Sequence, residues 1–200
     1  MKPMLGIILT LCFTQLAGCA FGTRYVELSY PPQKQVEMSS TVTQPVASGP
    51  RTQHVILAVN DARETTDRIG NVRNTLGMDT ASILTEDNIA VWVHDAIAFE
   101  LDRLGYQLLD HRGALSNKSA DRLTANVQKV FCDIYAVYDG EVSLQATLER
   151  AGREPVTAEF PAKVSSGLSF ASSGKATGES LGRTLQTAIR NMLRDFGFTD

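Results

Sequence analysis

The sequence predicts an α+β fold, with a mainly antiparallel sheet and two helices packed on one of its faces. Two observations support this prediction. Apolar residues recur every three or four positions over residues 89–104 and again over 181–196, which is the period of an amphipathic helix. Between these segments, apolar and polar residues alternate over 142–149, which is the period of a strand with one buried face.

The first element of the expected domain is a strand. Residues 54–60 form a short, almost continuous apolar run that ends in a polar turn signal. The following stretch, residues 60–81, is polar and contains Gly70 and Gly77, so we expect a long loop there. Loops of this length are uncommon inside compact domains and often carry function.

The first helix is expected to follow directly. Thr85 is the predicted N-cap, because Glu86 and Asp87 would then lie in the first turn, where acidic groups interact favourably with the helix dipole. Gly105 stands where a glycine is expected just beyond a helix C-terminus. Residues 106–109 are then predicted to form a short strand.

Three further strands are expected as an antiparallel meander. Residues 123–138 are predicted to be one long, bent strand, and Asp139-Gly140 is a hairpin turn signal. The strand at 142–149 then returns, and residues 156–164 form the third strand.

The second helix ends the chain, and its start has two interpretations. It begins at Gly174 or, because glycine costs about 1 kcal/mol in a helix interior, only near Gly178. If the helix includes both of them and Gly182, the three glycines share one face. That face would allow a close approach to the sheet.

The N-terminus has the layout of an export signal. Lys2 precedes an apolar run over residues 4–16, which is shorter than the roughly 20 residues that a membrane-spanning helix needs. The run ends in Leu16-Ala17-Gly18-Cys19, which resembles the bacterial lipobox. The resemblance implies a diacylglyceryl thioether on Cys19, cleavage before this residue and acylation of the new amino group. Ala20, in place of an aspartate, implies transport to the periplasmic leaflet of a Gram-negative outer membrane.

These signals divide the chain into three predicted parts. They are a signal peptide over residues 1–18, the lipidated cysteine with a flexible tether over 19–52, and a single α+β domain over 53–200. The tether is rich in Pro, Ser, Thr and Gln. Its residues 23–29 alternate weakly, so a short strand docked on the domain is the alternative there. Lipidation of Cys19 would leave Cys132 as an unpaired thiol, which we expect to be buried.

Several short motifs occur along the chain in a definite order. They are the lipobox, the Pro-rich segment, VILAVNDAR at 55–63, RIG at 68–70, LxxLGY at 101–106 and the C-terminal helix. Together they resemble the YajG-type lipoproteins of proteobacteria, over most of the chain. The resemblance implies a location and no particular activity. A looser similarity, at the level of fold, is to the auxiliary lipoproteins of ABC-type transport systems.

The best candidate site follows the first strand. Asp61 and Arg63 are two residues apart at a strand end and so face the same side, and Arg68 and Asn71 lie nearby in sequence. The favoured interpretation is a structural ion pair that fixes the loop, since such pairs are common. The alternative is that the arginines contact a carboxylate or phosphate of a partner.

The sequence contains no nucleophile or acid–base set, so we expect no enzyme activity, no cofactor and no metal. The net charge of −3 and the pI near 5.6 argue against a nucleic-acid partner. The expected function is a non-enzymatic binding or assembly module, anchored to the outer membrane and contacting an envelope protein.

The alternative function is an auxiliary subunit of an envelope transport system that handles lipid or small molecules. An apolar pocket between sheet and helices would favour this transport hypothesis. A polar sheet face with an exposed apolar patch near residues 60–81 would favour the binding module.

Overall fold

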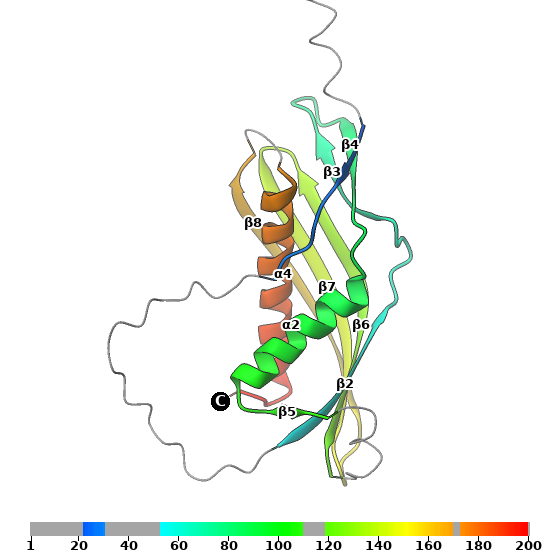
Figure 1. Cartoon of the computed structure of the whole chain (residues 1–200), viewed down its shortest axis with the longest axis vertical. Helices are drawn as coiled ribbons and strands as arrows, with labels where there is room; N and C mark the ends of the chain where they lie inside the picture. The colour runs from blue at the N-terminus through cyan, green and yellow to red at the C-terminus, as the bar shows by residue number, and fades with distance from the viewer. Residues whose placement is uncertain (1–21, 31–52, 110–118, 170–172, 200) are drawn as a thin grey trace, which may run out of the picture.

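A sheet of eight strands is covered on one face by two helices (Figure 1). The computed structural model of the protein describes residues 22–30, 53–109, 119–169 and 173–199. The α+β prediction with two helices on one face is confirmed. The predicted signal peptide, Cys19 and the expected tether beyond Tyr30 lie outside the described residues.

Within the described residues, one helix lies inside the run of strands and another follows the last strand. In order, the elements are β1 (Gly22–Tyr25), β2 (His54–Asp61), β3 (Arg68–Arg73), β4 (Asp79–Leu84), α2 (Ile89–Arg103), β5 (Gln107–Leu108), β6 (Asp121–Ile134), β7 (Val137–Glu149), β8 (Val156–Leu168) and α4 (Gly174–Asp195). No helix in these described ranges is long and apolar enough to cross a membrane.

The sheet is organised around β6. One edge of β6 pairs with β7, and β7 pairs with β8. The other edge is shared by two strands, because β2 pairs with residues 121–127 and β3 pairs with residues 132–134. β5 extends the sheet beyond β2, whereas β4 and then β1 extend it beyond β3.

The prediction of a mainly antiparallel sheet is wrong, because the sheet is mixed. The β6–β7–β8 meander is antiparallel as expected, but four of the seven strand pairs are parallel. β5 and β6 both run parallel to β2, although β3, β4 and α2 come between β2 and these strands in the chain. Alternation of apolar residues reports which face a strand buries and not the direction of its neighbour.

The prediction of one long loop over residues 60–81 is wrong. β3 and β4 form an antiparallel hairpin inside this stretch, and its turn is closed by hydrogen bonds between Asn74 and Met78. The hairpin was missed because β3 carries few large apolar residues, with Ile69 fully buried and Val72 partly buried. Its place in the sheet depends on pairing with β6 and β4, which strand propensity does not report.

The bend expected in the long strand is a β-bulge in β6. Odd-numbered residues face the core from Leu123 to Val127, and even-numbered residues face it from Val130 to Ile134. The register with β7 skips Gln128, which is the extra residue that changes the buried face.

The predicted hairpin turn at Asp139-Gly140 is wrong. β6 ends at Ile134 and β7 starts at Val137, so the turn comes earlier and both residues lie inside β7. Gly140 has a different role, because a Cβ at this position would overlap the Thr184 hydroxyl of α4. Glycine therefore allows α4 to pack closely on β7.

Helix α2 begins later than predicted. Its N-cap is Asn88, whose side chain accepts a hydrogen bond from the backbone N–H of Val91 at 3.1 Å, and not Thr85. The Asp87 carboxylate instead accepts a hydrogen bond from the backbone N–H of Leu28 at 2.6 Å. The predicted end is confirmed, because Gly105 follows the helix with a φ of 86°.

Residues 22–30 are docked on the domain, which is the alternative that the sequence left open for this stretch. β1 pairs in parallel with β4, and the following residues run along the two helices (Figure 1). The Tyr30 hydroxyl donates to the buried carboxylate of Glu100 at 2.7 Å. Burial, together with this hydrogen bond, raises the pKa of Tyr30, so its hydroxyl remains a donor.

Helix α4 begins at Gly174, the earlier of its two expected starts. A Cβ at Gly178 would overlap the backbone carbonyl oxygen of Glu27. A Cβ at Gly174 would lie 3.3 Å from the backbone oxygen of Tyr25, so these two glycines face the docked segment and not, as we had expected, the sheet. Glycine makes the helix less stable than alanine would, but only a residue without a Cβ allows this close approach.

The core fills the space between the helices and the sheet. Val93 and Ile97 of α2 and Leu185 and Ile189 of α4 have no exposed surface. Cys132 is buried and free, as expected. Burial, and then the nearby Asp139 and Asp133, raise the pKa of its thiol to about 12, so it is an inert core side chain at neutral pH.

Candidate functional site

A cleft of about 510 Å³ lies between the chain that follows β2 and the middle of β6. We call it the β6-edge cleft. Its walls are Ala62, Arg63, Glu64, Thr65, Arg68, Asn71, Asp79, Gln128, Lys129, Val130 and Phe131. Three of the four residues that the sequence singled out, Arg63, Arg68 and Asn71, therefore lie at one site.

The cleft exists because β2 and β3 share one edge of β6 without meeting. β2 pairs with β6 as far as Val127, and β3 starts to pair with it only at Cys132. Within the described chain, residues 128–131 therefore have no strand beside them on this edge. Such a stretch is about 13 Å long. The connection from β2 to β3 passes outside this edge (Figure 1).

Asp61 and Arg63 form a closed ion pair at the start of this connection. The Nε and Nη2 atoms of Arg63 donate to the two carboxylate oxygens of Asp61, each at 2.8 Å. Nη2 also donates to the backbone oxygen of Thr66 at 3.1 Å. The hydrogen bonds from Arg63 hold the pKa of Asp61 below its usual range. This is the structural ion pair that the sequence favoured, and it fixes the outer wall of the cleft.

We expect an Asp61→Asn variant to reveal this pair as a pH-dependent contribution to stability. Because the pKa of Asp61 is lowered on folding, its contribution is complete above about pH 4 and is lost as the pH falls further. At neutral pH the variant should lose about 1 to 2 kcal/mol, since Asp61 is partly exposed and solvent screens the pair. Urea unfolding between pH 7 and pH 3 measures the difference.

Asp67→Asn, an exposed carboxylate in the same connection, is the matched control. It should unfold like the wild type at each pH. Identical profiles for the two variants would contradict a specific role for Asp61.

A second network surrounds Asp79 on β4. Its carboxylate accepts hydrogen bonds from Asn71 Nδ2 at 2.7 Å, Arg68 Nη2 at 3.3 Å and Arg73 Nε at 3.2 Å. Arg63 and Arg68 therefore each have a carboxylate beside them. A carboxylate or phosphate from outside would compete with these carboxylates, so the ion pairs agree with the structural interpretation that the sequence favoured.

Two buried polar atoms at this cleft have no hydrogen-bond partner. They are Nη1 of Arg63 and Oδ1 of Asn71, whose residues are only 8% and 6% exposed. A buried donor or acceptor without a partner costs about 1–3 kcal/mol. Because both atoms are buried, a bound chain would reach them only if the walls of the cleft moved.

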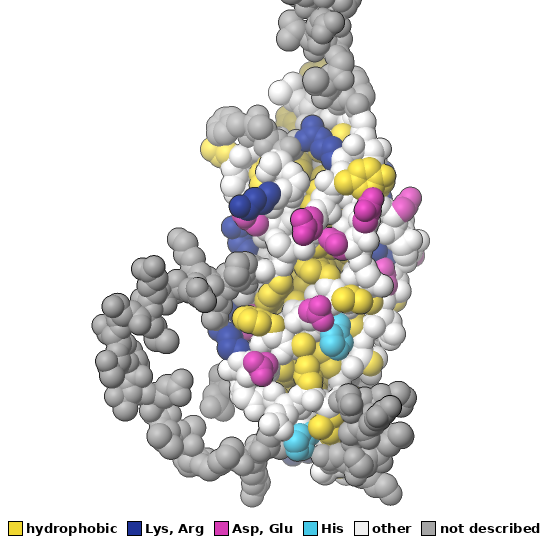
Figure 2. Space-filling model, viewed as in Figure 1, with side chains coloured by type: hydrophobic (Ala, Val, Ile, Leu, Met, Phe, Trp, Pro, Cys, Tyr) yellow, Lys and Arg dark blue, Asp and Glu magenta, His cyan; other side chains and the backbone are white. Residues whose placement is uncertain are grey.

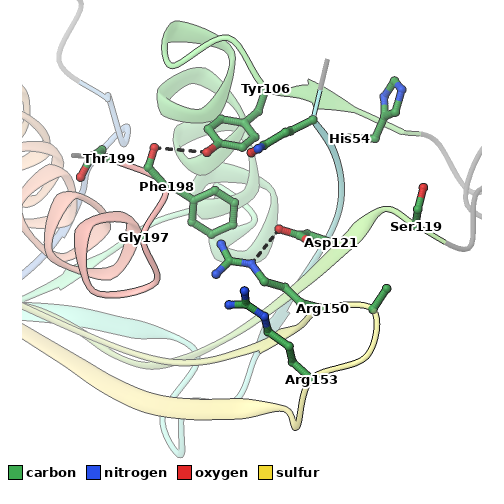
Figure 3. Close-up of a pocket in the computed structure, with 11 residues that line it drawn as sticks. His54, Tyr106, Ser119, Asp121, Arg150, Arg153, Gly197, Phe198 and Thr199 are labelled. Carbon is green, nitrogen blue, oxygen red and sulfur yellow. Dashed lines mark hydrogen bonds and ion pairs between the residues drawn. The ribbon is translucent and has the colours of Figure 1, made fainter. Parts of the chain in front are cut away.

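A second cleft, of about 670 Å³, lies at the opposite end of β2, where α4 ends (Figure 3). We call it the terminal cleft. Arg150 donates to Asp121 and to the backbone oxygen of Phe196, both at 2.9 Å, and its guanidinium lies 5.4 Å from the Phe198 ring. The Tyr106 hydroxyl donates to the backbone oxygen of Phe198 at 3.3 Å. These contacts tie the end of the chain to the sheet.

Sequence reasoning missed the terminal cleft. Asp121 and Arg150 are far apart in sequence and carry no local motif. Only the register of β6 and β7, which pairs Arg122 with Glu149, brings them together. The Arg150 guanidinium is already engaged by Asp121, Phe196 and Phe198, so we interpret this network as structural.

The charges of the surface are mixed in sign. On the face shown in Figure 2, acidic and basic side chains are interspersed and no continuous basic patch is visible. Within the described ranges, no three His, Cys, Asp or Glu side chains are grouped to hold a metal ion.

Residues 40–199 match the family model described as "Uncharacterized lipoprotein". No curated protein matches the chain. An uncharacterised protein of solved structure is 8% identical, with 89% of this chain and 99% of that chain covered and a TM-score of 0.54. A protein from Xanthomonas campestris is 12% identical, with coverages of 86% and 92% and a TM-score of 0.50. At these identities the likeness concerns the fold alone.

Proposed function

Because the chain belongs to a family of uncharacterised lipoproteins, we propose that it is a lipid-anchored periplasmic protein that binds an envelope partner and catalyses no reaction. The proposed anchor is Cys19, which follows the lipobox residues Leu16 to Gly18. Ala20 after the anchor supports the outer membrane as its location. Within the family, the order of motifs supports a YajG-type protein with a signal peptide over 1–18 and one domain over 53–200.

The unpaired stretch of β6 in the β6-edge cleft is the observation that carries the binding role. An extended peptide adds to a free strand edge through main-chain hydrogen bonds, and neighbouring side chains supply specificity. Residues 128–131 offer such an edge, with room for about four residues. Glu64 and Lys129 add charges of both signs, and Phe131 adds an apolar wall. The partner we propose is therefore an extended segment of another envelope protein.

The transport hypothesis has less support. It called for an apolar pocket between sheet and helices, but that space contains fully buried side chains such as Val93, Ile97 and Leu185. The binding hypothesis called for an exposed apolar patch near residues 60–81, and Leu76 and Met78 in the β3–β4 turn are exposed. The auxiliary transport subunit stays as the second candidate function.

Site-specific photocrosslinking tests the binding role. We expect a crosslinking residue at Thr65, on the wall of the β6-edge cleft, to capture one reproducible protein when the full chain is expressed in cells. Lys129→Glu should lower the yield, because it reverses a charge in the cleft.

Lys163→Glu is the matched control for this experiment. Both lysines contact Glu141, at 2.7 Å from Lys129 and 3.2 Å from Lys163, but only Lys129 lines the β6-edge cleft. The control should leave the yield unchanged. Co-purified lipid without any crosslinked protein would support the transport hypothesis instead, and an equal loss in both variants would contradict a site at the cleft.

A further inference from the structure

Four large apolar side chains are exposed at one end of the sheet. Leu76 and Met78, in the β3–β4 turn, are 80% and 54% exposed. Tyr135, in the β6–β7 turn, is 51% exposed, and Leu168 at the end of β8 is 66% exposed. We call these four residues the apolar end. Water-exposed side chains of this size, gathered at one end, indicate an interaction surface.

The apolar end is continuous across three neighbouring elements. The Tyr135 hydroxyl donates to the backbone oxygen of Thr75 at 3.0 Å, which joins the two turns. Leu168 pairs with Val137, which follows the β6–β7 turn directly. Figure 1 shows the two turns and the end of β8 at the same end of the sheet.

The proposed lipid anchor belongs to this same end. β1 runs parallel to β4, with Gly22 paired to Ala81, so the two strands start at the same end of the sheet. Before β4 the chain leads back to Met78, and before β1 it leads back to Cys19. Cys19 precedes Gly22 by three residues, which span at most about 11 Å when extended. A lipid on Cys19 therefore holds the apolar end close to the bilayer.

Charged side chains of β3, β4 and β6 near this end form one network of ion pairs. Arg73 Nε lies 3.2 Å from a carboxylate oxygen of Asp79 and 3.2 Å from one of Asp133. Asp79 also contacts Arg68 at 3.3 Å. Within this network two arginines offset two aspartates, which lowers the cost of bringing an apolar surface against it.

We propose that the apolar end rests on the lipid surface to which the chain is anchored, with Leu76 and Met78 at the level of the headgroups. This inference rests on the proposed anchor at Cys19. A single anchor allows the domain to tilt freely, whereas a second apolar contact fixes its orientation. In that orientation the terminal cleft points away from the membrane, and the β6-edge cleft opens to the side, where a partner has access.

Depth-dependent quenching tests the inference. Full-length lipoprotein with Leu76→Cys is labelled with an environment-sensitive fluorophore and reconstituted into phosphatidylethanolamine–phosphatidylglycerol vesicles that contain doxyl-labelled lipid. Cys132 should remain unlabelled because it is buried. We expect a blue shift of the emission and a loss of intensity that depends on the doxyl lipid. A label on Leu168→Cys should show the same blue shift and quenching. Agreement between the two positions excludes an effect of the label on its own surroundings at one site.

Val156→Cys is the matched control. Val156 is 54% exposed, like Met78, but it starts β8 and pairs with Leu148, at the opposite end of the sheet. Its label should show neither change. Mass spectrometry of the same samples independently measures whether Cys19 carries lipid. Lipid on Cys19 without quenching at 76 and 168 overturns this inference alone, and a blue shift without quenching assigns the surface to contact with a second copy of this chain. Absence of lipid on Cys19 overturns the proposed anchor and the inference together.

Discussion

A Cys19→Ser variant is expected to incorporate no fatty acid and to accumulate as an uncleaved precursor. The thiol is the group that accepts lipid in the lipobox chemistry that this sequence resembles, and a hydroxyl does not replace it. Each buried methylene contributes about 0.8 kcal/mol to membrane binding, and one chain alone anchors only marginally. Removing every chain should therefore abolish stable attachment. Labelling with a clickable fatty acid and the mass of the processed chain measure both effects in cells.

Cys132→Ser is the control for the anchor, because this thiol is buried in the domain. It should retain full labelling and processing. Globomycin should block processing of the wild type, and Ala20→Asp should move the lipidated protein from the outer to the inner membrane in a density gradient. Unchanged processing and attachment in Cys19→Ser would show that the lipobox interpretation is wrong.

Gly70→Ala is expected to be the most destabilising single-methyl change in the described domain. Gly70 pairs with Cys132 where β3 meets β6, and a Cβ there would overlap the Cys132 backbone oxygen. A backbone atom cannot rotate away, so the two strands must separate. We expect a loss of about 3 kcal/mol in the free energy of unfolding, or about 6 to 12 °C in the melting temperature.

Gly77→Ala, in the turn of the same hairpin, is the matched control. No atom lies within 4 Å of a Cβ at this position, but its φ is 78°. The expected cost is therefore only the strain of a left-handed alanine, about 1 kcal/mol. Thermal and urea unfolding compare the two variants. Equal losses would mean that the β3–β6 contact does not limit stability.

The parts of the fold that follow a local period were predictable from the sequence. The stripe of α2 and the alternation along β7 appear where they were expected, because each side chain's burial depends on its position within its own element. Gly105 was predictable for the same reason, since a left-handed glycine ends a helix locally.

The parts that depend on distant partners were not predictable. The N-cap of α2 is Asn88 and not the predicted Thr85. The Asp87 carboxylate, which we expected in the first turn, instead accepts a hydrogen bond from the backbone N–H of Leu28. The candidate site was predictable only in part. Asp61 and Arg63 are neighbours in sequence and do pair, but their cleft is formed by residues 128–131, which no motif connects to them.

By itself, the sequence determined the α+β class and the buried faces of the main elements, and it is the basis for the proposed lipidation at Cys19. These properties depend on residues that are close together in the sequence, and a lipidation signal is likewise recognised as a short stretch of chain. The tertiary structure decided that the sheet is mixed, that residues 22–30 dock on the helices and that β2 and β3 leave part of β6 unpaired. Strand direction and register arise from hydrogen bonds between segments far apart in the chain, and local patterns are equally compatible with several such pairings.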